Sequence, residues 1–119
     1  MANKFTLERA PDTRALSLTV EGRTAVLSAA EVDDLIRQLA DCRARMTPIQ
    51  PAEPPDDPAQ LHTADNLLWS VKALPDRSAI QFAMQHPGLG WVAMALSRAQ
   101  VEDLQTSFEF ELVKIPQAG

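Results

Sequence analysis

The sequence is poor in the residues that build most catalytic and metal sites, with one cysteine, two histidines and four glycines. Cys42 cannot form a disulfide within the chain, and its place in a helical pattern predicts a small core residue. Free thiols are typical of a reducing compartment, so we expect a cytoplasmic location. The first residues lack the apolar stretch of a secretory signal, and no apolar run is long enough to span a bilayer.

Clusters of basic residues are also missing. The chain carries 11 Lys and Arg against 16 Asp and Glu, a formal net charge of −5, and its cations are scattered. Nucleic acids and anionic membranes attract basic patches, so neither is an expected partner. A nucleic-acid surface would have to be assembled from Arg9, Arg14, Arg23 and Arg77.

Neither histidine has a neighbour at the spacing of a complete metal site. His62 and Asp65 could supply two ligands, whereas a structural zinc site needs four and a catalytic one needs three. His86 opens the stretch HPGLG, which lacks the lysine and the helix of a phosphate-binding loop. Ser28 and Ser97 have a structural explanation, and nothing positions a base beside the other serines. We therefore expect no catalytic residue, no metal and no cofactor, in a protein that is not an enzyme.

What the sequence does contain is a repeated segment, because LSAAEVDDL returns later as LSRAQVEDL. Ser28 and Ser97 stand at N-cap positions, and Glu31 and Gln100 follow three residues later, which completes two capping boxes. A leucine before each serine and a valine four residues after it match a hydrophobic staple. We interpret this pair of helix starts as the result of an internal duplication.

The similarity extends to the residues before each helix. FTLE at 5–8 resembles WSVK at 69–72, and PDTRAL at 11–16 resembles PDRSAI at 75–80. Alternation of apolar and polar residues in these stretches predicts half-buried strands. The alternating apolar positions are Leu16, Leu18 and Val20 in the first half and Ile80, Phe82 and Met84 in the second. Further inward positions in the second half are Trp69, Val71, Val92, Met94 and Leu96.

Together these signals predict a two-layer α+β fold made of two pseudo-symmetric βββα repeats. The strands should form one mainly antiparallel sheet of about six strands, with both helices on one face. We place the first repeat at 1–46, a proline-rich linker at 47–62 and the second repeat at 63–119. Each half alone is small for independent stability, so a single domain over 1–119 with a shared core is expected.

Helices are expected at about 29–46 and from 98 to about 113. The end of the second helix is open to two interpretations. FEFEL at 108–112 alternates like a strand, whereas Phe108 and Ile115 continue a helical apolar stripe. The correspondence with the first half favours the helix.

The linker contains five of the nine prolines of the chain. Proline at this density prevents regular helix or strand pairing and favours an extended path. Such a segment can reach about 40 Å at roughly 3.1 Å per residue. An exchange of halves between two chains therefore stays open.

One face of the second half predicts a protein interface. The side chains there are small and mostly uncharged, with one tryptophan, which is the composition of an interface core. The alternative is that the tryptophan folds over the edge of the sheet. The expected function is a non-enzymatic protein-binding or assembly module of adaptor, inhibitor or chaperone type, acting as a homodimer or with a protein partner. The predicted interface residues are Trp91, Ala93, Ala95, Gln81, Ala83 and Gln85.

A small-molecule-binding domain is the second hypothesis. Two related halves can leave a cleft between them, and ligand pockets favour such junctions. The residues expected to line it are Trp69, Trp91, His86, Arg77 and Gln81.

Overall fold

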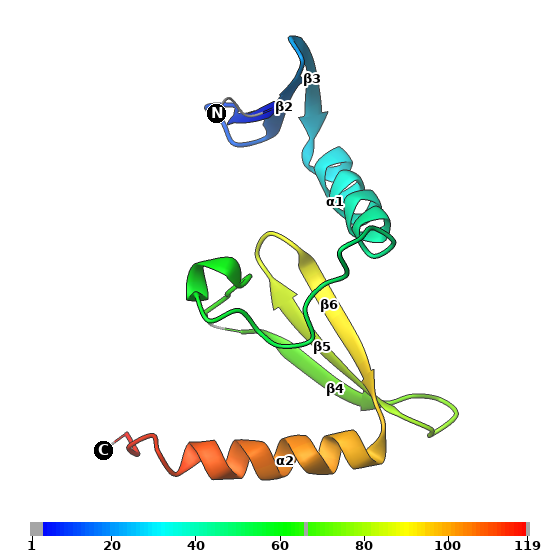
Figure 1. The fold of residues 1–119 in the computed structure, drawn as a ribbon, viewed down its shortest axis with the longest axis vertical. Helices are drawn as coiled ribbons and strands as arrows, with labels where there is room; N and C mark the ends of the chain where they lie inside the picture. The colour runs from blue at the N-terminus through cyan, green and yellow to red at the C-terminus, as the bar shows by residue number, and fades with distance from the viewer. Residues whose placement is uncertain (1–3, 66, 119) are drawn as a thin grey trace. The chain divides into compact units, whose positions relative to one another are not determined.

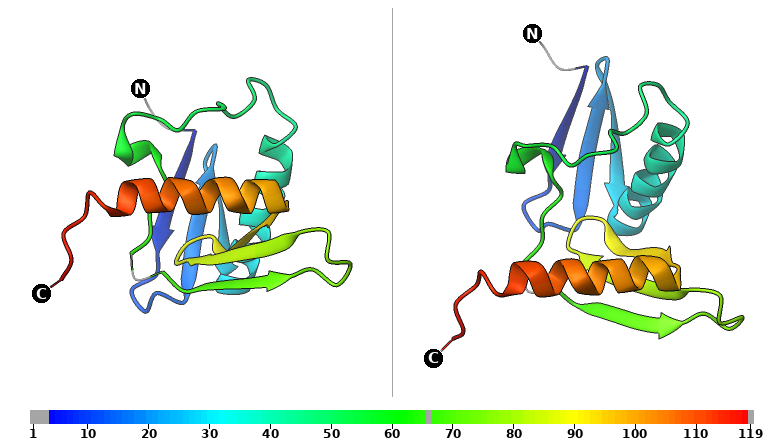
Figure 2. Two further views of the ribbon diagram at one scale, coloured as in Figure 1. Left: turned by 90° about the horizontal axis from the view of Figure 1, so that it is seen from below. Right: turned by 60° about the horizontal axis from the view of Figure 1, so that its bottom comes forward.

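The computed structural model describes residues 4–65 and 67–118, which form an α+β fold with the order βββα twice (Figure 1). The chain divides into two compact units, Met1–Pro58 and Ala59–Gly119. Figure 2 shows that a helix continues from the last strand of each unit. The first unit contains β1 (Phe5–Arg9), β2 (Ala15–Val20), β3 (Arg23–Ser28) and α1 (Ala29–Arg43). The second contains β4 (Trp69–Ala73), β5 (Ile80–His86), β6 (Gly90–Leu96) and α2 (Arg98–Leu112).

The strands form two antiparallel sheets of three strands each, ordered β1-β2-β3 and β4-β5-β6. The sequence predicted one sheet of about six strands, and this detail was wrong for the described residues. Consecutive strands joined by short turns pair with each other first, and each sheet is complete within its own unit. That the two units form a single domain, with both helices on one face, stays a prediction.

The two sheets have the same register. Leu7 lies opposite Leu18 across β1 and β2, and Val71 lies opposite Phe82 at the corresponding place in β4 and β5. This agreement follows from the matching alternation of apolar residues, since a slip of one residue would reverse every side chain. The agreement is compatible with a duplication, which stays an interpretation.

The loops between the first two strands of each unit also match. The backbone N–H of Arg14 donates to Asp12 Oδ1 at 3.0 Å, and that of Ser78 donates to Asp76 Oδ1 at 3.0 Å. An aspartate that accepts from the backbone two residues later stabilises a tight turn locally. The Pro-Asp turns predicted from the sequence are therefore present. The left-handed residues after the two aspartates are Thr13 (φ 61°) and Arg77 (φ 58°).

Both helices begin with the predicted capping box. The backbone N–H of Glu31 donates to Ser28 Oγ at 3.2 Å, and the backbone N–H of Ser28 donates to Glu31 Oε1 at 3.0 Å. In α2 the same two bonds join Ser97 and Gln100 at 3.2 and 2.9 Å. Each box satisfies two backbone donors that a helix start would otherwise leave unpaired.

Helix α1 ends at Arg43, three residues before the predicted end. The backbone N–H of Arg45 then donates to the Cys42 carbonyl and that of Met46 to the Arg43 carbonyl, a tighter spacing than in an α-helix. Pro48 disfavours helical geometry at Thr47, which limits how far the helix could extend but does not account for its end at Arg43. Cys42 is exposed, so its predicted place in the core was wrong.

Helix α2 includes the stretch FEFEL, which settles the choice between strand and helix. Beyond its end, Lys114 Nζ lies 3.0 Å from Glu111 Oε2 and 4.5 Å from the centre of the Phe110 ring. These contacts join residues three and four apart, a spacing that brings side chains together on a helix but not on a strand.

The hairpin after the second strand differs between the units. In the first unit Val20 pairs with Arg23, which leaves a two-residue turn in which Glu21 and Gly22 have φ of 50° and 81°. Positive φ at both turn residues is the geometry that matches the twist of a hairpin. In the second unit the pairing extends to His86↔Gly90 and leaves three residues in the turn.

The linker is free of α-helix and strand in the part that the structure describes, as its prolines predicted. The element found there is one 3-10 turn, Pro58–Gln60. The boundary between the two units also falls within the predicted 47–62 segment.

Candidate protein-interaction surface

The six residues predicted as an interface lie together on one face of the β5–β6 hairpin. Side chains two residues apart on a strand point to the same face, and directly paired residues share that face. We call this surface the small-residue face. Its three cross-strand pairs are Gln81↔Ala95, Ala83↔Ala93 and Gln85↔Trp91.

Strand β4 extends the small-residue face with Ser70 opposite Ala83 and with Lys72 opposite Gln81. Ala83 is 7 % exposed, and among the described residues it is the one hydrophobic residue that is buried. Trp91 is 55 % exposed, at the end of the hairpin nearest its turn. The face therefore combines a buried alanine with an exposed aromatic side chain at one end, and it carries one charge, Lys72, among the described residues of these strands.

The opposite face of the same sheet is entirely apolar at its nine central positions. These positions form three rows across the three strands. We call them the apolar grid of the second unit. The rows are Trp69, Met84 and Val92; Val71, Phe82 and Met94; and Ala73, Ile80 and Leu96.

Five of the nine positions of the apolar grid are exposed, and Trp69 is 62 % exposed, Val71 47 % and Met94 46 %. The other four positions are half-buried, and they are Ile80, Phe82, Met84 and Leu96. The sequence correctly placed these residues on one face, but it expected that face to be turned into a core. Exposed apolar surface of this extent is uncommon in a protein that functions alone.

Helix α2 does not cover the apolar grid. Its first turns approach one corner of the sheet, where Val101 and Gln105 line a hollow together with Ala73 and Ile80. The helix then runs on with its own apolar residues exposed, and Phe108 is 67 % exposed (Figure 1). Much of the sheet face and of the helix stripe that the sequence assigned to the interior is therefore exposed.

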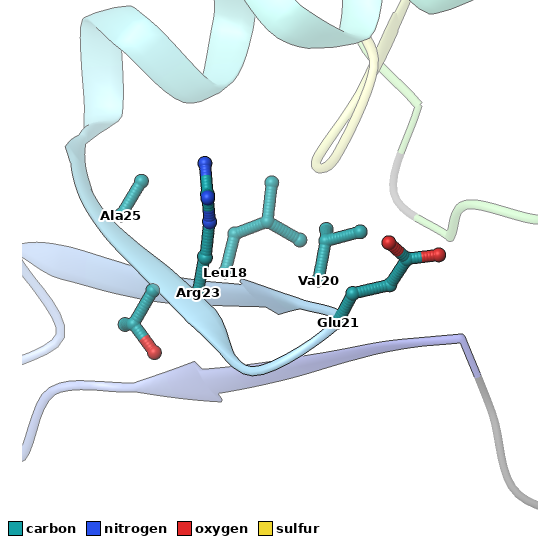
Figure 3. A pocket seen from close by; sticks show the side chains of 6 residues that line it. Leu18, Val20, Glu21, Arg23 and Ala25 are labelled. Carbon is teal, nitrogen blue, oxygen red and sulfur yellow. The ribbon is translucent and has the colours of Figure 1, made fainter.

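The first unit has an equivalent face with a different composition. Figure 3 shows Leu18, Val20, Arg23 and Ala25 projecting from the same side of the β2–β3 hairpin, with Glu21 at its turn. Two of the nine corresponding positions are arginines. The rows are Phe5, Val20 and Arg23; Leu7, Leu18 and Ala25; and Arg9, Leu16 and Leu27.

Both histidines lie near the turn of the β5–β6 hairpin. Nδ1 of His86 accepts hydrogen bonds from the backbone N–H groups of Gly88 at 3.0 Å and Leu89 at 3.1 Å. The His62 ring meets the His86 ring edge to face, with 6.1 Å between the ring centres. His86 thus holds its own turn together, which accounts for its place in the sequence without a ligand.

The segment before β4 lies against this end of the sheet. The backbone N–H of Gln85 donates to the Leu68 carbonyl at 2.9 Å, which extends the pairing of β4 and β5. The segment and the sheet enclose a hollow of about 420 Å³. Its lining is Leu61, His62, Thr63, Ala64, Leu67, Met84, Gln85, His86, Leu89 and Val92.

The residues predicted to line a small-molecule cleft do not converge. Trp69 belongs to the apolar grid, whereas Trp91 and Gln81 lie on the opposite face of the same sheet. Arg77 lies in the loop before β5, and His86 ends that strand. One pocket cannot be lined by both faces of a sheet, so this set of residues was wrong as a site.

The titratable groups with shifted pKa values have structural explanations. Hydrogen bonds from the backbone and side chain of Ser78 lower the pKa of Asp76, and the capping bonds of Ser28 lower that of Glu31. The bonds end on Oδ1 of Asp76 and on Oε1 of Glu31, so each shift comes from a local turn or cap. In the described part of the chain, no three His, Cys, Asp or Glu side chains are placed to hold a metal ion.

Comparison of the chain with protein-family models, with curated proteins and with solved structures found no match. Among the described residues, no helix has the length and apolar character needed to cross a membrane. The two faces of the second sheet are therefore the features on which a functional proposal can be built.

Proposed function

We propose that the chain is a non-enzymatic protein-binding or assembly module of the adaptor, inhibitor or chaperone type. The observation that carries this proposal is the exposed apolar grid of the second unit, in which Trp69, Val71 and Met94 are each about half exposed or more. Large contiguous apolar patches on a protein surface mark sites of association, because leaving them in water costs free energy.

The small-residue face supports the same proposal in a different way. It is depleted of charge and carries one aromatic side chain, Trp91, which is 55 % exposed. Tryptophan is among the residues that contribute most to binding free energy in interfaces. The second sheet therefore offers two surfaces of different character, and a cytoplasmic location and the absence of nucleic-acid partners stay predictions.

Two measurements on the purified chain test this proposal. Sedimentation equilibrium gives the mass in solution, and binding of an apolar fluorescent dye reports apolar surface that remains in water. A mass above 13.1 kDa supports self-association. A monomer that binds the dye supports association with another protein. A monomer that does not bind the dye covers its own apolar surface and contradicts the proposal.

A small-molecule site is the second candidate function, moved from the predicted cleft to the hollow beside His62 and His86. Its volume of about 420 Å³ lies in the range of about 300–1,000 Å³ that is usual for ligand pockets. A thermal-shift screen of metabolites tests it, since a ligand at about 100 times its Kd adds roughly 2.7 kcal/mol of stability. The variant Leu67→Glu should abolish any shift that arises in this hollow.

A further inference from the structure

We infer that His86 is a pH-sensitive clip for the turn of the β5–β6 hairpin. The neutral ring holds the turn closed through two hydrogen bonds at Nδ1, and a protonated ring releases it. All of the atoms involved belong to the second unit. The clip goes beyond the proposed function and does not depend on it.

The proton of the neutral His86 ring is located by the hydrogen bonds of the turn. The backbone N–H groups of Gly88 and Leu89 both donate to Nδ1, at 3.0 and 3.1 Å. A ring nitrogen that accepts a hydrogen bond carries no proton, and a neutral imidazole has one N–H group. The proton of the neutral ring is therefore on Nε2, and Nδ1 is an acceptor that two backbone groups share.

Protonation of the ring removes this acceptor. In the charged imidazole both nitrogens are donors, so an N–H at Nδ1 would face the N–H groups of Gly88 and Leu89. Among the described residues, Nδ1 of His86 is the one acceptor with which these two groups form a hydrogen bond. A backbone donor without an acceptor is costly unless water reaches it. The turn must therefore open when the ring becomes charged.

A second turn of this unit uses the same device with an acceptor that acid does not remove. Asp76 accepts from the backbone N–H of Ser78, two residues later, and His86 accepts from that of Gly88 at the same separation. A protonated carboxyl group still has an oxygen that can accept, whereas a protonated imidazole has no acceptor. Of these two turns, the one at His86 is therefore the one that a single proton can open.

The equivalent hairpin of the first unit is closed in a different way. Its turn residues, Glu21 and Gly22, both have positive φ, which is the backbone geometry of a tight two-residue hairpin turn. In the second unit three residues lie between His86 and Gly90, and the His86 ring supplies bonds within this longer turn. Opening by mild acid is therefore expected in the β5–β6 turn and not in the β2–β3 turn.

The surroundings of the ring offer no negative charge that would favour the protonated form. The titratable side chain in contact with His86 is His62, from the segment before β4, with 6.1 Å between the ring centres. The other described residues that line the adjoining hollow belong to that segment, to β5, to the turn and to β6, and none of them is charged. A charged His62 would repel a charged His86. The ring therefore gains no ion pair there to offset the lost bonds of the turn.

The clip controls the end of the hairpin that carries Trp91. His86 pairs with Gly90, and the preceding pair is Gln85↔Trp91. Loss of the two bonds at Nδ1 removes contacts that hold the turn beside these pairs. Because histidine ordinarily changes charge between about pH 5 and 8, mild acid should loosen this end of the hairpin and leave the rest of the β5–β6 pairing in place.

An NMR titration of the full, nitrogen-labelled chain tests the clip. At the upper end of the range, the nitrogen shifts of the His86 ring should be those of a bare Nδ1 and a protonated Nε2. As the pH falls from about 8 to about 5, the amide resonances of Gly88 and Leu89 should move with the same midpoint as the His86 ring. The amide of Gly22, in the turn of the first hairpin, should stay in place.

Substitutions separate the acceptor from the charge. Asparagine at the start of a turn accepts from the backbone two residues later, so His86→Asn should keep the bond to Gly88 and abolish the pH dependence of the two amides. His86→Ala should give both amides, at every pH, resonances close to those of the acid form. His62→Asn is the matched control and should leave the titration of the Gly88 and Leu89 amides in place.

Three results would overturn the clip. One is a neutral His86 ring with its proton on Nδ1, and another is a pair of amides that does not follow the titration of that ring. The third is a pH dependence that persists in His86→Asn and vanishes in His62→Asn, because the effect would then belong to His62. If the variants fail to fold, the titration of the unmodified chain decides alone. The proposed function is tested separately, by mass in solution and dye binding, and stands or falls without the clip.

Discussion

Trp69 and Trp91 project from opposite faces of one three-stranded sheet, because they lie opposite adjacent residues of β5. Trp69 pairs with Met84, and Trp91 pairs with Gln85. Their exposed fractions are similar, 62 % and 55 %, but their surroundings differ. Trp69 is part of an apolar face, and Trp91 is flanked by small and amide side chains. The two tryptophans therefore report separately on the two surfaces that the second unit presents.

Fluorescence quenching should distinguish the two tryptophans. Trp91→Phe leaves Trp69 as the one fluorophore of this type, and Trp69→Phe leaves Trp91, with the apolar character of each face kept. In a self-associated sample in which the apolar grid is buried, acrylamide should quench Trp69 several-fold less efficiently than Trp91. After dilution to monomer, the two should be quenched to a similar degree. Stronger protection of Trp91 in the concentrated sample would contradict this expectation.

The two capping boxes should respond differently to acid. The pKa of Glu31 is lowered from its usual value of 4.5 by its bonds to Ser28. A lowered pKa in the folded state means that Glu31 contributes stability above pH 4.5 and loses that contribution as the pH falls through the lowered value. Gln100 occupies the same place in α2, and its amide does not titrate.

An exchange of these two residues tests that difference. Glu31→Gln should keep the cap and remove the acid-sensitive part of the stability, whereas Gln100→Glu should introduce an acid-sensitive part into α2. Both effects are measured by unfolding in urea at a series of pH values that runs from neutral to below the usual pKa of Glu31. Ser28→Ala serves as the control for loss of the cap itself and should cost about 1 kcal/mol at neutral pH. An unchanged pH dependence in Glu31→Gln would show that other carboxylates set it.

Ser78 should control the ionisation of Asp76. Its backbone N–H and its hydroxyl both donate to Asp76 Oδ1, at 3.0 and 2.7 Å, and they lower the pKa of that carboxyl from 3.8. Ser78→Ala removes the hydroxyl, so the pKa of Asp76 should rise towards 3.8 in an NMR titration. Ser78→Thr keeps a hydroxyl and should retain most of the shift. The ionised Asp76 contributes stability above pH 3.8, and this contribution is lost as the pH falls through the lowered pKa. Because Ser78→Ala makes the pKa shift smaller, it should reduce both this contribution and the stability lost in acid.

The turn of the first hairpin should be less stable with any other residue in place of Gly22. Gly22 has a φ of 81°, where a Cβ atom meets no neighbour but strains the backbone. Gly22→Ala should therefore lower the free energy of unfolding by about 1 kcal/mol. Gly88→Ala is the matched control, because that glycine lacks a positive φ and a Cβ there would meet His86 at ordinary contact distance. Equal losses in the two variants, measured by chemical denaturation, would argue against backbone strain as the cause.

The features that could be predicted from the sequence are those written in local residue spacings. A capping box needs only a serine and the residue three positions later, so Ser28 and Ser97 were recognisable without any tertiary information. The hairpins follow from turn residues and alternation in the same way. Alternation also placed all six small-residue-face positions correctly on one side of β5 and β6, because side-chain direction has a period of two.

The features that could not be predicted depend on what lies opposite a surface. Alternation shows that Trp69, Val71 and Met94 share an apolar face, but it does not show which segment covers that face. The single six-stranded sheet and the buried Cys42 failed for this reason, since both required contacts between distant parts of the chain. The composition did indicate that the two equivalent faces differ. All nine grid positions are apolar in the second unit, whereas the first unit has seven apolar residues and two arginines at the corresponding positions.

The longer hairpin of the second unit has a consequence for recognition. The pair Met84↔Val92 corresponds to Val20↔Arg23, where the first hairpin turns back, but β5 and β6 continue for two more pairs. Trp91 stands on that overhang, so the first unit has no counterpart for it. A molecule that binds Trp91 on this longer hairpin would therefore recognise a feature that distinguishes the second unit from the first.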